Sequence, residues 1–446
     1  MSEIQYVIKR NGTLVPFVPD RITNVIYRAA VAVGGRDKST AEELAQKVIQ
    51  YLQEHTPEGH IPNVEEIQDV VEKILIENGH SKVAKAYILY RDERARLREQ
   101  REAISIRPST NIPWAKIWQV LDWAVTHNLN TVEVLNQRIA NGELADIISE
   151  SEMFYEMDIK NASEMIIERQ KDLRVVLISG PSSSGKTTTT IKIGQRLSHK
   201  KINLVTLNVD NYFYDLELHP RDEFGDYDFE TPQALNLEMV NDHLKRLIAG
   251  QEVLTPFYDF KNGHRTDNHT PMKIKNNEII LIDSLHGLYP AMTEGIPDEQ
   301  KFRLYLEPLL QMKDPKGNYI RWTDIRLMRR MLRDAAYRAY DPEKTLTHWH
   351  YVRASEMRTI IPNNVTANYI INSAMPYELS IYRPKLIDYF GQWAQKYKDD
   401  PLHQDAYERS ARAYELLQSI AALNDDSMIP PDSVIREFIG GSTLKY

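Results

Sequence analysis

The sequence contains no cysteine. Disulfide bonds, thiolate catalysis and cysteine-ligated zinc sites are therefore excluded together. It also lacks an apolar run long enough to cross a bilayer and the apolar core of a secretion signal, so we expect a cytoplasmic protein without membrane association. Basic residues are in deficit, with 55 Lys and Arg against 63 Asp and Glu and a formal net charge of -8. This balance argues against a general nucleic-acid-binding protein.

The chain is long enough for two or three domains, with 446 residues of which 42% are hydrophobic. We expect a small α+β domain in residues 1–101, made of a β-hairpin and helices. A helical connector should occupy residues 102–170. Residues 171–446 should form an α/β domain with a parallel sheet flanked by helices, followed by a C-terminal helical segment.

One stretch, GPSSSGKTT at residues 180–188, matches the pattern G-x-x-x-x-G-K-[ST] at every fixed position. An apolar run at 174–179 predicts a buried strand before it, and residues 187–198 have helical spacing after it. Backbone N–H groups of such a loop bind phosphate, and we expect ATP and Mg²⁺ as cofactors. Lys186 should reach the β- and γ-phosphates, and the Thr187 hydroxyl should hold the metal. The expected nucleotide-binding residues are Gly180, Ser182, Ser183, Ser184, Gly185, Lys186, Thr187 and Thr188.

Two aspartates follow predicted strands of the same domain. Asp210 ends the strand predicted at 202–208, which we expect to be buried beside the phosphate-loop strand. A carboxylate at that edge is suited to act as general base for an attacking hydroxyl, although a lone Asp there is as often a turn or capping residue. Asp283 follows the strand predicted at 278–282, where a carboxylate holds Mg²⁺ or its water.

A helix predicted at 323–339 carries five arginines: Arg326, Arg329, Arg330, Arg333 and Arg338. A basic helix that faces a phosphate site is typical of a lid that stabilises the transferred phosphoryl group. The alternative is a solvated charged face.

The start of the chain predicts two short strands at 5–9 and 13–17, joined by a hairpin turn at Asn11-Gly12. Four helices should follow. The first has Asp20 as its N-cap, the second starts near Ser39, the third starts at Asn63 with a capping-box pattern, and the fourth starts near residue 81.

This order resembles the ATP cone, a regulatory nucleotide-binding domain known from ribonucleotide reductases. The residues that carry the resemblance are VIKRNG at 7–12, Phe17, Arg21-Ile22 and AKAYILYR at 84–91. The resemblance implies an adenine-nucleotide effector whose phosphates contact Lys9, Arg10 and Arg21. Position 21 is more often lysine in that family, and the alternative is that these three charges are only solvated.

Residues 173–373 resemble the uridine kinase and phosphoribulokinase family. The motifs are residues 180–188, DNYF at 210–213, YDFE at 227–230, PFYDF at 256–260, HGL at 286–288 and RRMLRD at 329–334. The tail IREFIGG at 435–441 extends the likeness to a bacterial subgroup with an extra N-terminal domain. The resemblance makes Asp210 the general base and Arg333 and Arg338 the lid arginines. It places Glu230 on ribose hydroxyls and lines the acceptor site with Tyr258, Phe260, His264 and Arg265.

The family usually has a histidine two residues before the arginine, and here that position is Gly263. The leading hypothesis is a uridine or cytidine kinase that forms the 5′-monophosphate under control of the N-terminal domain. A kinase of another nucleoside, a pentose phosphate or a polyol is the second hypothesis, and a nucleotide-sensing regulator without kinase activity is the third. A homo-oligomer agrees with all three, because cones often act by changing assembly.

Overall fold

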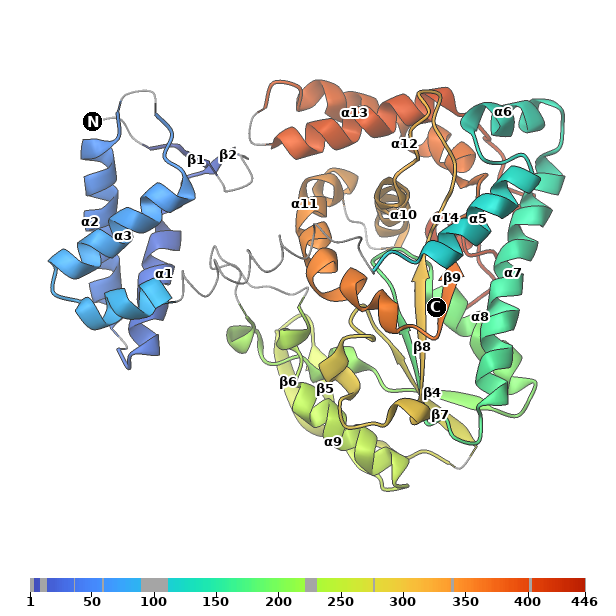
Figure 1. Cartoon of the computed structure of the whole chain (residues 1–446), viewed down its shortest axis with the longest axis horizontal. Helices are drawn as coiled ribbons and strands as arrows, with labels where there is room; N and C mark the ends of the chain where they lie inside the picture. The colour runs from blue at the N-terminus through green and yellow to red at the C-terminus, as the bar shows by residue number, and fades with distance from the viewer. Residues whose placement is uncertain are drawn as a thin grey trace. The chain divides into compact units, whose positions relative to one another are not determined.

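The computed structural model describes residues 4–8, 14–35, 37–57, 60–89, 111–220, 231–275, 277–337, 341–400 and 403–445. They form two compact units, one built mainly from residues up to 89 and the other mainly from residue 111 onward (Figure 1). Within these ranges, no helix is both long and apolar enough to cross a membrane.

The N-terminal unit starts with two antiparallel strands, β1 (Tyr6–Ile8) and β2 (Leu14–Pro16). Three helices follow, α1 (Pro19–Ala32), α2 (Lys38–His55) and α3 (Val64–Glu77), and residues 81–89 are helical as well. The predicted order of a strand pair and four helices is confirmed, while the Asn11-Gly12 turn lies outside the described residues. The helices share one core, formed mainly by Ile22, Ile26, Leu44, Val48, Leu52, Val71, Ile74 and Leu75.

Two predicted helix starts in this unit have different outcomes. The Asn63 side chain accepts the Glu66 N–H at 3.0 Å while the Glu66 carboxylate accepts the Asn63 N–H at 3.1 Å, so the capping box of α3 is confirmed. The prediction of Asp20 as N-cap of α1 is wrong, because the helix begins at Pro19 with Val18 as N-cap. Proline suits the first helical position, since its φ is already helical and its missing N–H has no partner to lose there.

The second unit is organised around a five-stranded sheet with the order β4-β7-β3-β8-β9. Its strands are β3 (Val175–Ser179), β4 (Asn203–Thr206), β7 (Glu278–Asp283), β8 (Lys301–Glu307) and β9 (Tyr369–Asn372). Every neighbouring pair runs parallel, so all carboxyl ends meet at one edge, with β3 in the centre. The predicted parallel sheet is confirmed.

The expected position of β4 is wrong in one respect. It pairs with β7 rather than with β3, so it is an edge strand. None of its four residues is fully buried. Apolar content alone did not distinguish this half-exposed edge strand from a central one, because both carry β-branched and leucine side chains.

Different helices cover the two faces of the sheet. On one face, Val175 and Leu177 of β3 pack with Val240 and Leu244 of α9 (Leu237–Ile248). On the other face, α8 (Lys186–Ser198) contacts β3, β4 and β7 and packs on α7 (Leu144–Glu168), which also reaches β9 (Figure 1). The helix that follows the phosphate loop is therefore held by both the sheet and α7.

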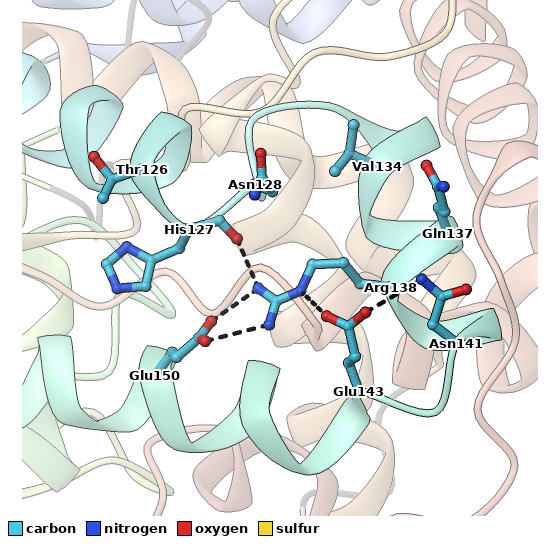
Figure 2. A pocket seen from close by; sticks show the side chains of 9 residues that line it. All are labelled: Thr126, His127, Asn128, Val134, Gln137, Arg138, Asn141, Glu143 and Glu150. Carbon is cyan, nitrogen blue, oxygen red and sulfur yellow. Dashed lines mark hydrogen bonds and ion pairs between the residues drawn. The ribbon is translucent and has the colours of Figure 1, made fainter.

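Before α7 lie α5 (Trp114–Thr126) and α6 (Val132–Ala140), in the same compact unit as the sheet. Figure 2 shows the polar hollow between these helices, with Arg138 at its centre. Its guanidinium pairs with Glu143 and Glu150, each at 2.8 Å, and donates to the His127 carbonyl at 2.6 Å. Because these partners come from the end of α5, from α7 and from the turn before α7, Arg138 of α6 links the three helices.

The remaining elements surround the carboxyl edge of the sheet. An antiparallel hairpin is formed by β5 (Val253–Asp259) and β6 (His264–Met272). The helices of the second half are α10 (Trp322–Tyr337), α11 (Pro342–Ser355), α12 (Glu378–Lys396), α13 (Gln404–Ser419) and the short α14 (Arg436–Ile439).

Candidate functional site

The phosphate loop joins the end of β3 to the start of α8, as predicted. Ser183 (φ 60°) and Gly185 (φ 92°) both adopt left-handed backbone conformations, which curl the loop so that successive N–H groups can face one point. Gly180 is required for a different reason. A Cβ there would lie 2.2 Å from the Leu306 carbonyl oxygen, because β8 runs directly past the loop.

The residues of this loop fit a bound phosphate. The hydroxyl oxygens of Ser183 and Ser184 are buried and have no hydrogen-bond partner among the described residues. Such groups are costly to bury unless a ligand or water satisfies them. The Lys186 ammonium folds over the loop and donates to the Gly180 carbonyl at 2.9 Å. The loop therefore offers both a cationic group and unsatisfied donors to an anion.

Asp283 ends β7 next to the phosphate loop. Its carboxylate accepts a hydrogen bond from the Thr190 hydroxyl at 3.1 Å. Burial raises the pKa of Asp283 and lowers the pKa of Lys186, while the attraction between the two charges opposes both shifts. The structure thus places Lys186 and Asp283 close enough for their charges to interact.

Asp283 and the exposed Thr187 side chain are the groups that would hold Mg²⁺. No three metal-ligating side chains come together anywhere in the described ranges. Mg²⁺ is usually bound through one or two carboxylates plus substrate phosphates, with water at the other positions.

Asp210 lies just beyond β4, in a short 3-10 turn (Val209–Tyr212) capped by Asn208, whose side chain accepts the Asp210 N–H at 3.1 Å. Its side chain reaches solvent at the mouth of the site. The protein around it nevertheless raises its pKa, first by removing hydration and second through the charge of Asp283, while Lys186 acts in the opposite direction. A carboxylate with a raised pKa is better matched to accepting a proton from a hydroxyl group.

The predicted arginine-rich helix is present as α10, but its arginines do not all lie on one basic face. Arg326 and Arg329 are fully buried. Arg326 makes a bidentate pair with Glu356 at 2.6 and 2.8 Å, and it donates to the Ser182 carbonyl at 3.1 Å. Arg329 makes a bidentate pair with Glu378 at 2.7 and 3.0 Å. Buried guanidinium groups need such partners, so these two residues brace the loop from inside the protein.

The next turn of α10 does face the loop. Arg330 donates to the Ser182 hydroxyl at 3.3 Å, and both Arg330 and Arg333 bond to Asp334, at 3.3 and 3.1 Å. The positive charge of Arg333 is felt at Lys186, whose pKa it helps to lower. Arg333 therefore lies close enough to Lys186 for its charge to act on the lysine, and Arg338 lies outside the described residues.

The hairpin contributes a cluster of aromatic rings beside Asp210. Tyr258 lies 5.5 Å from Phe213 and 5.0 Å from Phe260 between ring centroids, and Phe213 lies 5.4 Å from His219. Tyr258 is buried, whereas Phe260 is 68% exposed and offers an open ring face or edge. The two predicted aromatic residues are brought together, and Phe213 and His219 are two members that the sequence prediction missed.

The other predicted acceptor residues take different positions. Arg265 donates to the carbonyls of Tyr212 and Phe213 at 3.5 and 3.4 Å, and to the Asp267 carboxylate at 2.7 Å. The side chain of His264 is 67% exposed and lies 3.6 Å from Asp215. Glu230 falls outside the described residues.

Glu356 and Glu437 are carboxylates at the loop that sequence reasoning missed. Glu356 accepts the Ser182 N–H at 3.2 Å, and Glu437 accepts the N–H and hydroxyl of Thr188 at 3.1 and 2.8 Å. The run of arginines on α10 was the signal for Glu356. Arginines that lie among apolar residues on a helix are partly buried, and a buried guanidinium group needs a carboxylate partner. Glu437 had only its tail motif as a signal.

In the N-terminal unit, Arg21 lies half-buried in the first turns of α1. Lys9 and Arg10, between β1 and β2, lie outside the described residues. The proposed contacts of these three residues with an effector remain predictions.

Comparison with known proteins matches two family models to this chain. The ATP cone domain matches residues 5–96, and the phosphoribulokinase/uridine kinase family matches residues 175–379. A uridine kinase of Borrelia duttonii is 28% identical over 221 residues, which cover 48% of this chain and 96% of that protein. Uridine-cytidine kinase B of Dictyostelium discoideum is 25% identical over 198 residues, covering 44% and 73%.

A vitamin B12-dependent ribonucleoside-diphosphate reductase of Thermoplasma acidophilum is 36% identical over 140 residues. That match covers 30% of this chain and only 16% of the reductase. The similarity therefore concerns a small part of the reductase, and both predicted resemblances are confirmed at the level of domains.

Proposed function

We propose that this chain, which carries an ATP cone domain and a domain of the phosphoribulokinase/uridine kinase family, transfers the γ-phosphoryl group of ATP to the 5′-hydroxyl of uridine or cytidine. The observation that carries the proposal is the placement of Asp210. A carboxylate with a raised pKa stands within the electrostatic reach of Lys186 and Asp283, at the edge of the sheet where the phosphate loop begins.

Each group has a role that its chemistry supports. Lys186 and the loop N–H groups bind the phosphates, and Thr187 and Asp283 hold Mg²⁺, which supplies charge stabilisation at the transferred group when bound. Asp210 accepts the proton of the attacking hydroxyl. Arg333 adds positive charge on the side of α10.

The aromatic cluster of Phe213, Tyr258 and Phe260 supports a flat acceptor such as a nucleobase, because rings stack on one another favourably. One observation favours a different acceptor. His264 points toward Asp215 and solvent, so it is not positioned to read a base within the cluster. A kinase of another nucleoside, a pentose phosphate or a polyol is therefore the second candidate.

The test is a coupled assay of ADP release with ATP, Mg²⁺ and a panel of acceptors that starts with uridine and cytidine. We expect release that depends on uridine or cytidine. Release with a different acceptor alone would retain the kinase chemistry and replace the acceptor, and no acceptor-dependent release at all would favour the nucleotide-sensing regulator. Asp242 is an exposed carboxylate on α9, paired with Arg246 at 3.3 Å, and Asp242→Asn serves as the matched control for Asp210→Asn.

We further propose that the N-terminal unit binds an adenine nucleotide and adjusts kinase activity or assembly. Added dATP should change the steady-state rate or the oligomer size at fixed ATP, and Arg21→Ala should weaken that response at least several-fold. Lys38→Ala removes an exposed charge of the same unit and should leave the response unchanged. If dATP changes neither the kinetics nor the light scattering of the unmodified protein, the regulatory role is refuted.

A further inference from the structure

The tail of the chain returns to the start of α8 and places a carboxylate there. Glu437 is 7% exposed, and its Oε2 atom accepts both the backbone N–H and the hydroxyl of Thr188. Thr188 is the third residue of α8, so its N–H is one of the unsatisfied donors at the helix N-terminus that face phosphate in loops of this type. The carboxylate therefore occupies donors that a nucleotide phosphate also needs.

The backbone of this tail is firmly anchored. Asp432 pairs with Lys192 of α8 at 2.8 Å, and the Ser433 hydroxyl donates to Glu152 of α7. Arg436 donates to the carbonyls of Asp426 and Ile429 at 2.6 and 2.9 Å. With this anchoring, the lowest-cost movement is rotation of the Glu437 side chain rather than release of the tail.

Val434 adds a packing contact with the phosphate loop to the hydrogen bonds that Glu437 makes with Thr188. A Cβ on Gly185 would lie 2.5 Å from the Cγ2 atom of Val434, so the tail packs directly against the glycine at the N-cap of α8. The Arg329 guanidinium lies 4.9 Å from the centre of the Phe438 ring. The tail is thus part of the wall of the phosphate loop.

The two carboxylates at the loop differ in their charge partners. Glu356 is paired with Arg326 at 2.6 Å and with Arg353 at 2.5 Å. Glu437, by contrast, has no ion pair with any described Lys, Arg or His, and the charges of Arg329 and Lys186 reach it over a longer range. Its negative charge is therefore not neutralised by a directly paired cation and would repel a phosphate brought to the same place.

We propose that Glu437 sets the nucleotide affinity of the phosphate loop by competing with a phosphate group for the two Thr188 donors. This inference rests on the proposed function, because it takes the loop to be the ATP site. Binding of ATP displaces the carboxylate, and the displaced charge weakens the complex. The tail thereby holds the affinity for ATP below the value that the loop alone would give.

The test is equilibrium binding of Mg²⁺ and a non-hydrolysable ATP analogue to the full chain. The component lost in Lys186→Ala is taken as binding to the phosphate loop, which separates it from binding to the N-terminal unit. We expect Glu437→Ala to lower the Kd of this component about tenfold, equivalent to about 1.4 kcal/mol. Glu437→Gln keeps the volume and an acceptor oxygen while removing the charge, so it should lower the Kd by a smaller factor of about three. Glu294→Gln, an exposed carboxylate of the same unit, should leave it unchanged.

The sign of the effect separates competition from a purely structural role. If Glu437 only stabilised α8, its removal would loosen the loop, and the Kd would rise or stay the same in both variants. Either result would overturn the inference. The ATP site would still stand in that case, provided that binding was lost in Lys186→Ala. Absence of Lys186-dependent binding in every protein would overturn the proposed function and this inference with it. If Glu437→Ala fails to fold, Glu437→Gln alone still tests the inference.

Discussion

Asp210→Asn is expected to lower kcat with the best acceptor by about 10³-fold, within the range that a positioned general base contributes. Asparagine keeps the shape and the backbone bond from Asp210 N–H to Asn208, but its amide does not accept a proton. The KM for ATP should change little, because no hydrogen bond or ion pair joins Asp210 to the described phosphate loop and the charge of Lys186 acts on it only at longer range. Single-turnover and steady-state ADP release measure both quantities.

The pH profile provides a second readout of the same residue. Desolvation and the charge of Asp283 raise the pKa of Asp210, and the base must be deprotonated to act. Activity should therefore fall as the pH drops through this raised pKa, at a higher pH than an ordinary aspartate would give. The acidic limb should disappear in Asp210→Asn. Retention of full activity or of an unchanged limb would exclude Asp210 as the base.

Glu378→Gln is expected to destabilise the second unit by about 3–5 kcal/mol, the usual effect of removing one member of a buried ion pair. Both Glu378 and Arg329 are completely buried, and the carboxylate also accepts hydrogen bonds from the Tyr382 hydroxyl and the Met375 N–H, each at 3.0 Å. The substitution leaves the buried guanidinium charged and without its paired carboxylate, while the charge of Glu437 acts on it at longer range. Because Arg329 also donates to the Ser373 carbonyl at 2.7 Å, the disturbance should spread toward the loop.

Denaturant unfolding followed by tryptophan fluorescence measures this effect selectively. All six tryptophans lie in the second unit, at residues 114, 118, 123, 322, 349 and 393. Glu164→Gln is the matched control, since its pair with Lys160 spans 3.8 Å and both side chains are more than half exposed. We expect the control to change stability by less than about 0.5 kcal/mol. An equally small change for Glu378→Gln would contradict the assigned role of the buried pair.

The parts of this protein that the sequence predicted well depend on local patterns. The loop at 180–188 has a fixed spacing, and Asn63 and Glu66 form their capping box within four residues. The carboxyl ends of β7 and of the loop strand meet because parallel strands share one edge, so Asp283 and Lys186 could be predicted to lie close together.

Other features depend on packing that no local pattern contains. The burial of Arg326 and Arg329 is set by Glu356 and Glu378, which lie 30 and 49 residues further along the chain. The contact between Thr188 and Glu437 spans 249 residues. The order of β4 and β7 also needed the structure, because an edge strand and a central strand differ mainly in their neighbours.

The two cross-links between the hairpin and the segment after Asp210 have a consequence for how this protein could change its acceptor. Arg265 bonds to the carbonyls of Tyr212 and Phe213, and the Asn211 side chain accepts the Tyr258 N–H at 3.3 Å. The wall of the proposed acceptor site is thus hydrogen-bonded to the segment that carries Asp210, the proposed base. We expect a substitution in β5 or β6 that admits a larger acceptor to shift Asp210 as well, so that selectivity and turnover change together.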